Sequence, residues 1–435
     1  MMKNTIKITL LILVMTSAFS CDKVILDPNS TLEPDVVGRS ENLIKLINGV
    51  QQRWSTDRAG IIYTSTHLSG LNTKELRLLN PGNAAENDVL LGGDDINGGN
   101  GILNSIWTNA MLCKKETTTI IDAADGAASD QSVANSLKAY ALFYRALAHG
   151  TLIQYFESIP LELIENSPFK NREEVLQNAI ADLEMAKGYI DEGLSSEVTS
   201  GVINSVSLGN SVNALLARFN LMLGEYDKAI SAAEAVDLSV KSTWVYDEAV
   251  PNPLAFWFGS QNVTQAKDLK FGLPAGLLPN PNDKRISFYT KVPDATDPSN
   301  VQLVGFWKEN LDGIPVYLPG EMLLIKAEAY ARKNQLVDAV TQLNLVLGKT
   351  EATDVFGLGA SLPAYSGGMT QMDVLNEIYK NRRIELYLTG LALEDNRRFN
   401  RPGPSDANAE RNRNFYPYPN AERDNNTSTP SNPSS

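Results

Sequence analysis

The sequence predicts a mostly α-helical protein: tetratricopeptide-like helical pairs forming a superhelical scaffold, with a large insertion of loops and short strands. Apolar residues recur at three- and four-residue spacings through long stretches such as 102–124 and 133–155. A helix–turn–helix pattern at 211–236 recurs at 319–346. Between these two repeats, at about 240–318, helical periodicity disappears and Pro, Asn, Gly and aromatic residues dominate.

The N-terminus has the pattern of an export signal. Lys3 and Lys7 precede a short apolar run at 8–15, and small residues follow before Cys21. The run is too short to cross a bilayer, which takes about 20 apolar residues. A Cys at this position is typical of a bacterial lipoprotein, whose thiol receives a lipid; the alternative is an ordinary secreted protein with an incidental Cys. We therefore expect a signal peptide at 1–20 and lipidation of Cys21.

The remaining residues divide into a tether and one domain. Pro, Asp and Asn are frequent in 21–40, which indicates an extended tether. Helical spacing begins at Glu41, and we expect a single domain from there to residue 435. Residues 80–101 are rich in Gly and Asn and predict a loop.

Both repeats contain small residues and a Tyr at spacings typical of such repeats. The first has Ala217, Gly224 and Tyr226, and the second has Ala327, Tyr330 and Ala339. Small residues let paired helices approach closely, and Tyr fills the space between pairs. Asn334 stands where a turn Gly is usual.

Composition and motifs argue against several functions. The net charge is −13 without a basic stripe, which argues against nucleic acid and anionic lipid as partners. The two His residues have no Cys or His at metal-ligand spacing, and no nucleophile motif or phosphate loop occurs. No acidic residue lies in an apolar run that would raise its pKa. We therefore expect no metal, no cofactor and no enzymatic activity; a hydrolase using two of the many acidic residues is the minority alternative.

Four regions, in order along the chain, resemble motifs of the SusD/RagB family of nutrient-binding outer-membrane lipoproteins. They are 141–161, 175–186, 319–329 and, for the last region, 381–398 together with 415–425. Each match is weak alone, but their order behind a lipoprotein signal is specific. The resemblance covers nearly the whole chain after the signal peptide.

This resemblance implies both a location and a function. Family members are anchored by lipid at the outer membrane, exposed at the cell surface, and lie over a TonB-dependent (SusC-like) transporter. They bind a glycan, or less often a peptide, deliver it to that transporter for nutrient uptake, and are not enzymes. The alternative is a helical-repeat interaction module that binds a peptide or a protein.

The fourth region also contains charged residues for which we expect a structural role. Arg382, Arg383 and Glu385 fall on one predicted helix. Arg is suited to bidentate pairing inside a packed interface, so we expect these residues to form an ion-pair network between the last helices.

The candidate glycan-binding residues come from the insertion and from the early loop. Aromatic rings stack on the C–H faces of sugars, and amide, carboxylate and guanidinium groups bind hydroxyls. Trp257 lies between two Phe in a strand-like run, and Trp307 precedes the polar run 308–310, which favours an exposed ring. The alternative is that these aromatic residues pack the insertion against the helices. The predicted stacking residues are Trp257, Tyr289 and Trp307, and the predicted hydroxyl-binding residues are Asn97, Asp95 and Arg285.

Overall fold

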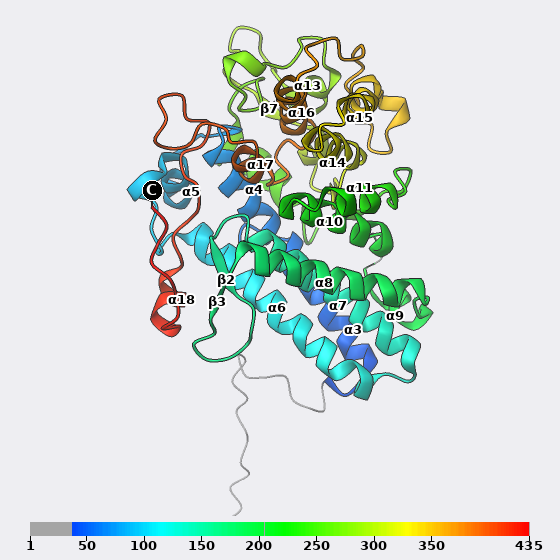
Figure 1. Cartoon of the computed structure of the whole chain (residues 1–435). Helices are drawn as coiled ribbons and strands as arrows, with labels where there is room; N and C mark the ends of the chain where they lie inside the picture. The colour runs from blue at the N-terminus through cyan, green and yellow to red at the C-terminus, as the bar shows by residue number, and fades with distance from the viewer. Residues whose placement is uncertain (1–36, 204, 435) are drawn as a thin grey trace, which may run out of the picture.

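The structure is a computed structural model that describes residues 37–203 and 205–434. The predicted signal peptide, Cys21 and nearly all of the predicted tether lie outside these residues. The described chain is mostly helical, as predicted, and its helices stack in successive layers (Figure 1). Among the described helices, none is long and apolar enough to cross a membrane.

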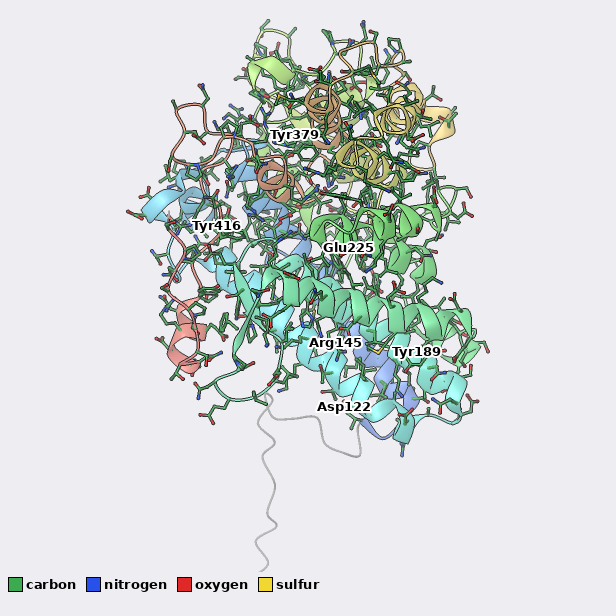
Figure 2. All side chains as sticks on the ribbon, viewed as in Figure 1. Asp122, Arg145, Tyr189, Glu225, Tyr379 and Tyr416 are labelled. Carbon is green, nitrogen blue, oxygen red and sulfur yellow. The ribbon has the colours of Figure 1, made fainter. Side chains whose placement is uncertain are left out.

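The N-terminal layer of the described chain consists of five helices. Its members are α3 (Ser40–Ser55), α4 (Ile61–Asn72), α6 (Gly101–Ala127), α7 (Gln131–Leu152) and α8 (Arg172–Asp191). Of these, α6, α7 and α8 begin with polar caps. Asp130 accepts a backbone amide at the start of α7, and Asn171 forms a capping box with Glu174 at the start of α8. Arg145 on α7, labelled in Figure 2, binds Asp182 on α8 through two hydrogen bonds of 2.8 and 2.7 Å. This bidentate pair fixes the two helices against each other.

Two helix pairs correspond to the predicted repeats. They are α10 (Leu208–Leu223) with α11 (Tyr226–Glu234), and α14 (Pro319–Arg332) with α15 (Leu336–Gly348). Both turns need a left-handed residue: Gly224 has a φ of 86° and Asn334 a φ of 61°. Asn tolerates this conformation better than most residues with a side chain, which explains why it replaces Gly in the second turn. Helix α11 packs against α14, so repeats that are far apart in sequence are neighbours in space (Figure 1).

Shorter elements make up the rest of the described chain. The remaining helices are α5 (Ala84–Leu91), α9 (Ser196–Gly201), α12 (Pro253–Ala255), α13 (Lys284–Tyr289), α16 (Gln371–Glu385), α17 (Ala392–Arg398) and α18 (Asn420–Asn425). The antiparallel strand pairs are β1 (Leu76–Leu78) with β5 (Thr264–Ala266), β2 (Ser158–Pro160) with β3 (Phe169–Asn171), β4 (Thr243–Trp244) with β8 (Ile314–Pro315), and β6 (Thr290–Lys291) with β7 (Gln302–Leu303). The short turns of helix are η1 (Gly93–Asp95), η3 (Ala275–Leu277), η4 (Gly305–Trp307) and η5 (Glu351–Thr353), and η2 (Phe256–Ser260) is a π-helix.

Two local predictions are wrong. Residues 80–101 contain a helix, α5, because Ala84–Leu91 supplies Ala, Glu and Leu, which are strong helix formers, between the Gly- and Asn-rich ends of the segment. The Phe-Trp-Phe run at 256–258 is not a strand; it continues α12 as a π-helix. Asn252 caps this helical segment, its Oδ1 accepting the backbone amides of the next turn at 2.9 and 3.1 Å.

The predicted ion-pair network between the last helices is confirmed for Arg382 only. Arg383 instead lies 3.5 Å from Glu75, and Glu385 binds Arg285 and Lys349, so these two residues tie α16 to other parts of the chain. Arg382 binds Asp395 through two hydrogen bonds of 2.8 and 3.0 Å, and Arg398 binds Glu328 at 2.6 and 3.0 Å. Burial alone would raise the pKa of the Glu328 carboxyl, but Arg398 and Arg382 hold that pKa below its usual value. The network joins α14, α16 and α17 through charges that are almost fully buried.

Candidate functional site

A short ladder, the β1–β5 pair, joins the insertion to the early part of the chain. Leu76 pairs with Ala266 and Leu78 with Thr264, and the amide of Leu79 donates to the carbonyl of Val263 at 3.0 Å. The segment that follows β1 therefore lies beside the segment that precedes β5. This pairing brings residues of the early loop next to the aromatic π-helix of the insertion.

Phe256 and Trp257 form the aromatic part of this junction. Their rings meet edge to face at 5.5 Å, and both are partly exposed, whereas Phe258 is buried. The Arg58 guanidinium carbon lies 4.7 Å from the centroid of the Trp257 ring, and Tyr63 contacts that ring edge to face at 6.0 Å. The indole is therefore held by a cation and a second ring while part of it faces solvent.

Polar contacts fix Arg58 in this position. Its Nη2 donates to Glu86 at 2.6 Å and to the Asn83 side-chain oxygen at 3.2 Å. The Tyr63 hydroxyl also donates to Glu86, at 2.7 Å. Burial, and then the charge of Glu86, raise the pKa of Tyr63, so its hydroxyl stays a neutral donor. The cation beneath Trp257 is thus oriented by a buried carboxylate.

Asn residues lie on the two chain segments that meet at this junction. The Asn80 side-chain oxygen accepts the amide of Gly82 at 2.8 Å, and its carbonyl accepts the amide of Asn83 at 3.0 Å, which makes a tight turn after β1. Asn262 is exposed immediately before β5. We call this surface the Trp257 platform; it consists of Arg58, Asn80, Asn83, Phe256, Trp257 and Asn262.

Sequence reasoning identified one residue of the Trp257 platform, Trp257 itself. The neighbouring Phe256 could have been found from the same aromatic run. Arg58 gave no signal, because it lies in the turn between α3 and α4 and reaches Trp257 only through the fold.

Two further predicted residues, Asp95 and Asn97, are exposed but lie away from the Trp257 platform. They follow α5, which begins beside Asn83 and whose eight residues span about 12 Å. The Asn97 side-chain oxygen accepts the amide of Gly99 at 2.9 Å. Their role in binding stays a prediction, and the structure does not bring them together with Trp257.

The exposure predicted for Trp307 is wrong, and Tyr289 is buried with it. Trp307 is 4% exposed and stacks on Tyr289, which is 0% exposed, with centroids 5.5 Å apart and planes at 18°. The polar run after Trp307 is exposed because Asp312 accepts the amides of Lys308 and Glu309 at 3.2 and 2.8 Å, forming a separate turn. The rings pack the insertion against the helices.

Arg285 is also a structural residue and does not face a ligand. Its side chain is 0% exposed and donates to Asp283 at 2.7 Å, to Glu385 at 3.0 Å and to the Asn381 side-chain oxygen at 2.7 Å. Lys349 binds the same Glu385 carboxylate. Because its donors face buried carboxylates and an amide, Arg285 ties the insertion to α16.

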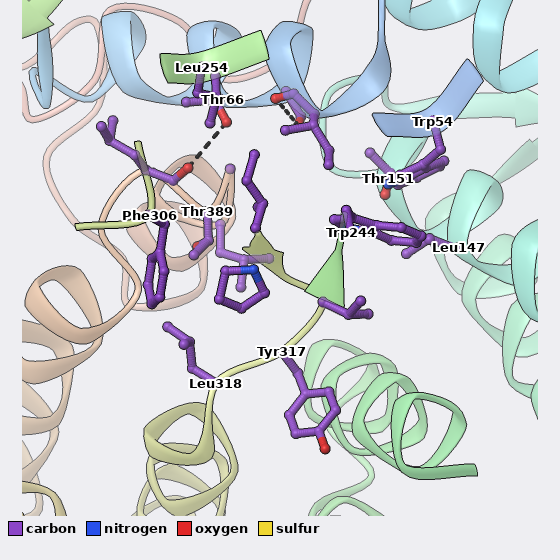
Figure 3. A pocket seen from close by; sticks show the side chains of 18 of the residues that line it. Trp54, Thr66, Leu147, Thr151, Trp244, Leu254, Phe306, Tyr317, Leu318 and Thr389 are labelled. Carbon is purple, nitrogen blue, oxygen red and sulfur yellow. Dashed lines mark hydrogen bonds between the residues drawn. The ribbon is translucent and has the colours of Figure 1, made fainter. Parts of the chain in front are cut away.

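Trp307 borders an internal cavity rather than a ligand site. In Figure 3, Trp54 and Trp244 lie on one side of the cavity and Phe306 on the other, and Thr66 donates to the carbonyl of Leu388 at 3.1 Å. The cavity volume is about 100 Å³. Sites for drug-sized ligands measure roughly 300–1,000 Å³, and an apolar cavity of about 150 Å³ holds one benzene. The cavity is therefore too small for an oligosaccharide.

Among the described residues, no group of three or more His, Cys, Asp or Glu side chains is arranged to hold a metal ion. The described chain is therefore a scaffold of helical pairs with a partly exposed aromatic platform between two segments.

Comparisons with known proteins show what this chain is similar to. Residues 309–434 match the model of the SusD family. A SusD homolog from Bacteroides thetaiotaomicron superposes with a TM-score of 0.71 at 12% identity, covering 93% of this chain and 99% of that one. A SusD superfamily protein from Bacteroides fragilis gives 0.69 at 18% identity, with coverages of 91% and 99%. No curated protein sequence matches.

A laminarin-binding SusD-like protein is also similar, with a TM-score of 0.60 at 16% identity, covering 91% of this chain and 98% of that one. The resemblance expected from the sequence is confirmed: the chain has the SusD-like fold, and its C-terminal part matches the SusD family.

Proposed function

We propose that this protein binds a glycan on the Trp257 platform and delivers it to a SusC-like, TonB-dependent transporter in the outer membrane. A lipid on Cys21 would hold the protein at the cell surface for this purpose. One observation carries the proposal: the β1–β5 ladder places the amides of the early turn beside the partly exposed Trp257.

The chemistry of the Trp257 platform supports a sugar as the ligand. A sugar ring presents C–H groups that pack on an indole, and its hydroxyls need nearby donors and acceptors. The exposed Asn80 and Asn262 offer both in their amide groups, whereas the Asn83 amide is already bound to Arg58 and to the Asn80 carbonyl. Among the similar structures, one is a SusD-like carbohydrate-binding protein from Bacteroides vulgatus, and another binds laminarin.

The same residues favour binding without catalysis. General acid or base catalysis needs a titratable group poised near the substrate. Arg58 and Tyr63, which contact the Trp257 ring, both donate to Glu86, and this carboxylate is buried. It orients the cation beneath the indole, so the Trp257 platform has no carboxylate presented to a bound sugar.

A matched pair of variants tests the proposal. Trp257→Ala removes the exposed indole, and Tyr189→Ala removes another partly exposed ring, on α8 and away from the insertion (Figure 2). Affinity electrophoresis against laminarin, starch, xylan and pectin measures binding. Loss of one stacked ring weakens binding by about threefold to tenfold or more, since aromatic contacts contribute about 0.5–1.5 kcal/mol beyond buried area.

Tyr189→Ala should bind like the wild type. Equal binding by the wild type and Trp257→Ala would refute the Trp257 platform as the glycan site. Retention of a peptide library with no retention of any polysaccharide would instead favour the helical-repeat interaction module.

A further inference from the structure

A hollow lined by lysines lies at the other end of the β1–β5 ladder. Its volume is about 430 Å³. It lies between the residues that follow β5 and the segment 407–410, in the loop between α17 and α18. We call it the lysine hollow; its lining includes Lys74, Lys267, Asp268, Lys270, Gly272 and Glu410. The wall is built by the turn before β1, the residues after β5 and the segment 407–410.

The charges that line the lysine hollow do not cancel. Glu410 is already bound by Arg401, at 2.5 Å. Asp268 accepts the backbone amide of Lys270 at 2.7 Å, which closes its own turn. Within the described part of the chain, no carboxylate lies within ion-pair distance of Lys74, Lys267 or Lys270; for comparison, Lys349 is held by two. The hollow therefore has a local excess of positive charge in a protein whose net charge is −13.

Backbone contacts hold two of these lysines close together. The amide of Lys267 donates to the carbonyl of Glu75 at 3.0 Å, and the Lys74 ammonium donates to the carbonyl of Ala409 at 2.5 Å. Burial and the neighbouring charge of Lys74 lower the pKa of Lys267. Two like charges held side by side favour the binding of an anion between them, and the Asp268 carboxylate offsets only part of the charge at Lys267.

The ladder connects the lysine hollow with the Trp257 platform. Lys267 and Val263 are separated by four residues of extended chain, which is about 13 Å. Arg77, which is partly exposed on β1, lies on the ladder between them. β5 itself is buried, but an oligosaccharide passing over the partly exposed β1 would contact the aromatic ring at one end and the lysines at the other.

We propose that the lysine hollow binds an anionic group of the glycan, a carboxylate of a uronic acid or a sulfate ester, and so selects acidic glycans. This inference rests on the proposed function and adds the substrate class. The overall charge of the protein repels polyanions, but salt screens charges beyond about 8 Å at physiological ionic strength. The local lysines therefore decide the recognition of an anionic group that contacts them.

The experiment uses polysaccharides that differ in charge. Polygalacturonate carries carboxylates, carrageenan carries sulfate esters, and agarose and laminarin are neutral. Affinity electrophoresis with each would be run on the wild type, on the double variant Lys74→Gln/Lys267→Gln, and on Lys115→Gln. Lys115 is an exposed lysine on α6 for which, in the described chain, no carboxylate is in ion-pair contact.

We expect retention of the wild type by polygalacturonate or carrageenan, and about tenfold weaker retention of the double variant, because charge-assisted contacts are lost. Which polyanion is retained distinguishes a carboxylate from a sulfate. Lys115→Gln should match the wild type, and 0.5 M NaCl should reduce the difference.

Equal retention of the double variant and the wild type would overturn the inference. Retention of neutral glycans alone, sensitive to Trp257→Ala but not to the lysine changes, would overturn the inference and leave the proposed function standing. If no polysaccharide of either kind is retained, both fail. All of the substituted lysines are exposed, so thermal melting should show that the variants stay folded.

Discussion

Trp307→Ala should strongly destabilise the protein. The indole is 4% exposed and contacts four rings: it stacks on Tyr289 and meets Phe258, Phe306 and Tyr387 edge to face at 6.3, 6.1 and 6.1 Å. Truncation of a buried Trp to Ala costs about 3–5 kcal/mol. The indole also borders the cavity of about 100 Å³, so the new space would join an existing void rather than be filled by small shifts.

This cost can be converted into a melting temperature. The entropy of unfolding averages about 2.1 cal/mol/K per residue, or about 0.8 kcal/mol/K for a domain of about 400 residues. A loss of about 3–5 kcal/mol therefore lowers Tm by about 4–6 °C if the domain unfolds cooperatively. Differential scanning calorimetry measures this shift, with the partly exposed Trp257→Ala as the matched control, for which a shift below about 2 °C is expected.

A Tm of Trp307→Ala within about 1 °C of the wild type would refute the reasoning. It would mean that the ring cluster of the insertion contributes little to the stability of the helical scaffold. A shift of equal size in Trp257→Ala would show instead that both indoles support packing, and the Trp257 platform would lose its main argument.

Two further predictions concern Glu75 and Cys21. Glu75 lies between α4 and β1 and is 1% exposed. Its Oε1 lies 3.5 Å from Arg383 Nη2, but neither oxygen accepts a well-formed hydrogen bond in the described chain, and burial outweighs the Arg383 charge and raises the pKa of Glu75 to about 7. Because this pKa exceeds the unfolded value of about 4.3, the protonated carboxyl stabilises the fold below about pH 4.3 and this contribution is lost as the pH rises through about 7. Glu75→Gln, which keeps the neutral form, should therefore have a Tm that rises relative to the wild type between pH 5 and pH 8; a difference independent of pH would contradict the assignment. Cys21→Ala should abolish labelling of the exported protein by radioactive palmitate, whereas full labelling of that variant would contradict lipidation at Cys21.

The sequence predicted the scaffold better than the site, for physical reasons. Helical periodicity and small-residue spacing are local signals, so α10 with α11 and α14 with α15 were found from the residues that form them. The exposure of an aromatic ring depends on distant residues. Trp307 was misplaced because the polar turn after it is exposed while its own ring points inward, stacked on Tyr289.

The Trp257 platform, too, could be predicted only in part from local sequence signals. Trp257 was identified as an aromatic residue in an irregular region, but Arg58 and Asn83 become its neighbours only through the β1–β5 ladder and the turn between α3 and α4. Arg285 looked like a surface cation beside polar loop residues, yet its carboxylate partners include Glu385, 100 positions away. Long-range pairs of this kind leave no periodic pattern in the sequence.

The β1–β5 ladder also has a consequence for the order of folding. It joins segments that are far apart along the chain; beside it, His67 on α4 bonds Thr264 on β5 across 197 positions. Closing so long a loop is slow compared with forming local helix pairs, because chain entropy is lost before the contacts form. The N-terminal helices can therefore assemble early, while the turn with Asn80 and Asn83 reaches its final position only when β5 of the insertion pairs with β1. The proposed binding surface needs both the turn after β1 and the segment before β5. A folding intermediate in which β5 has not yet paired with β1 should therefore not bind the ligand.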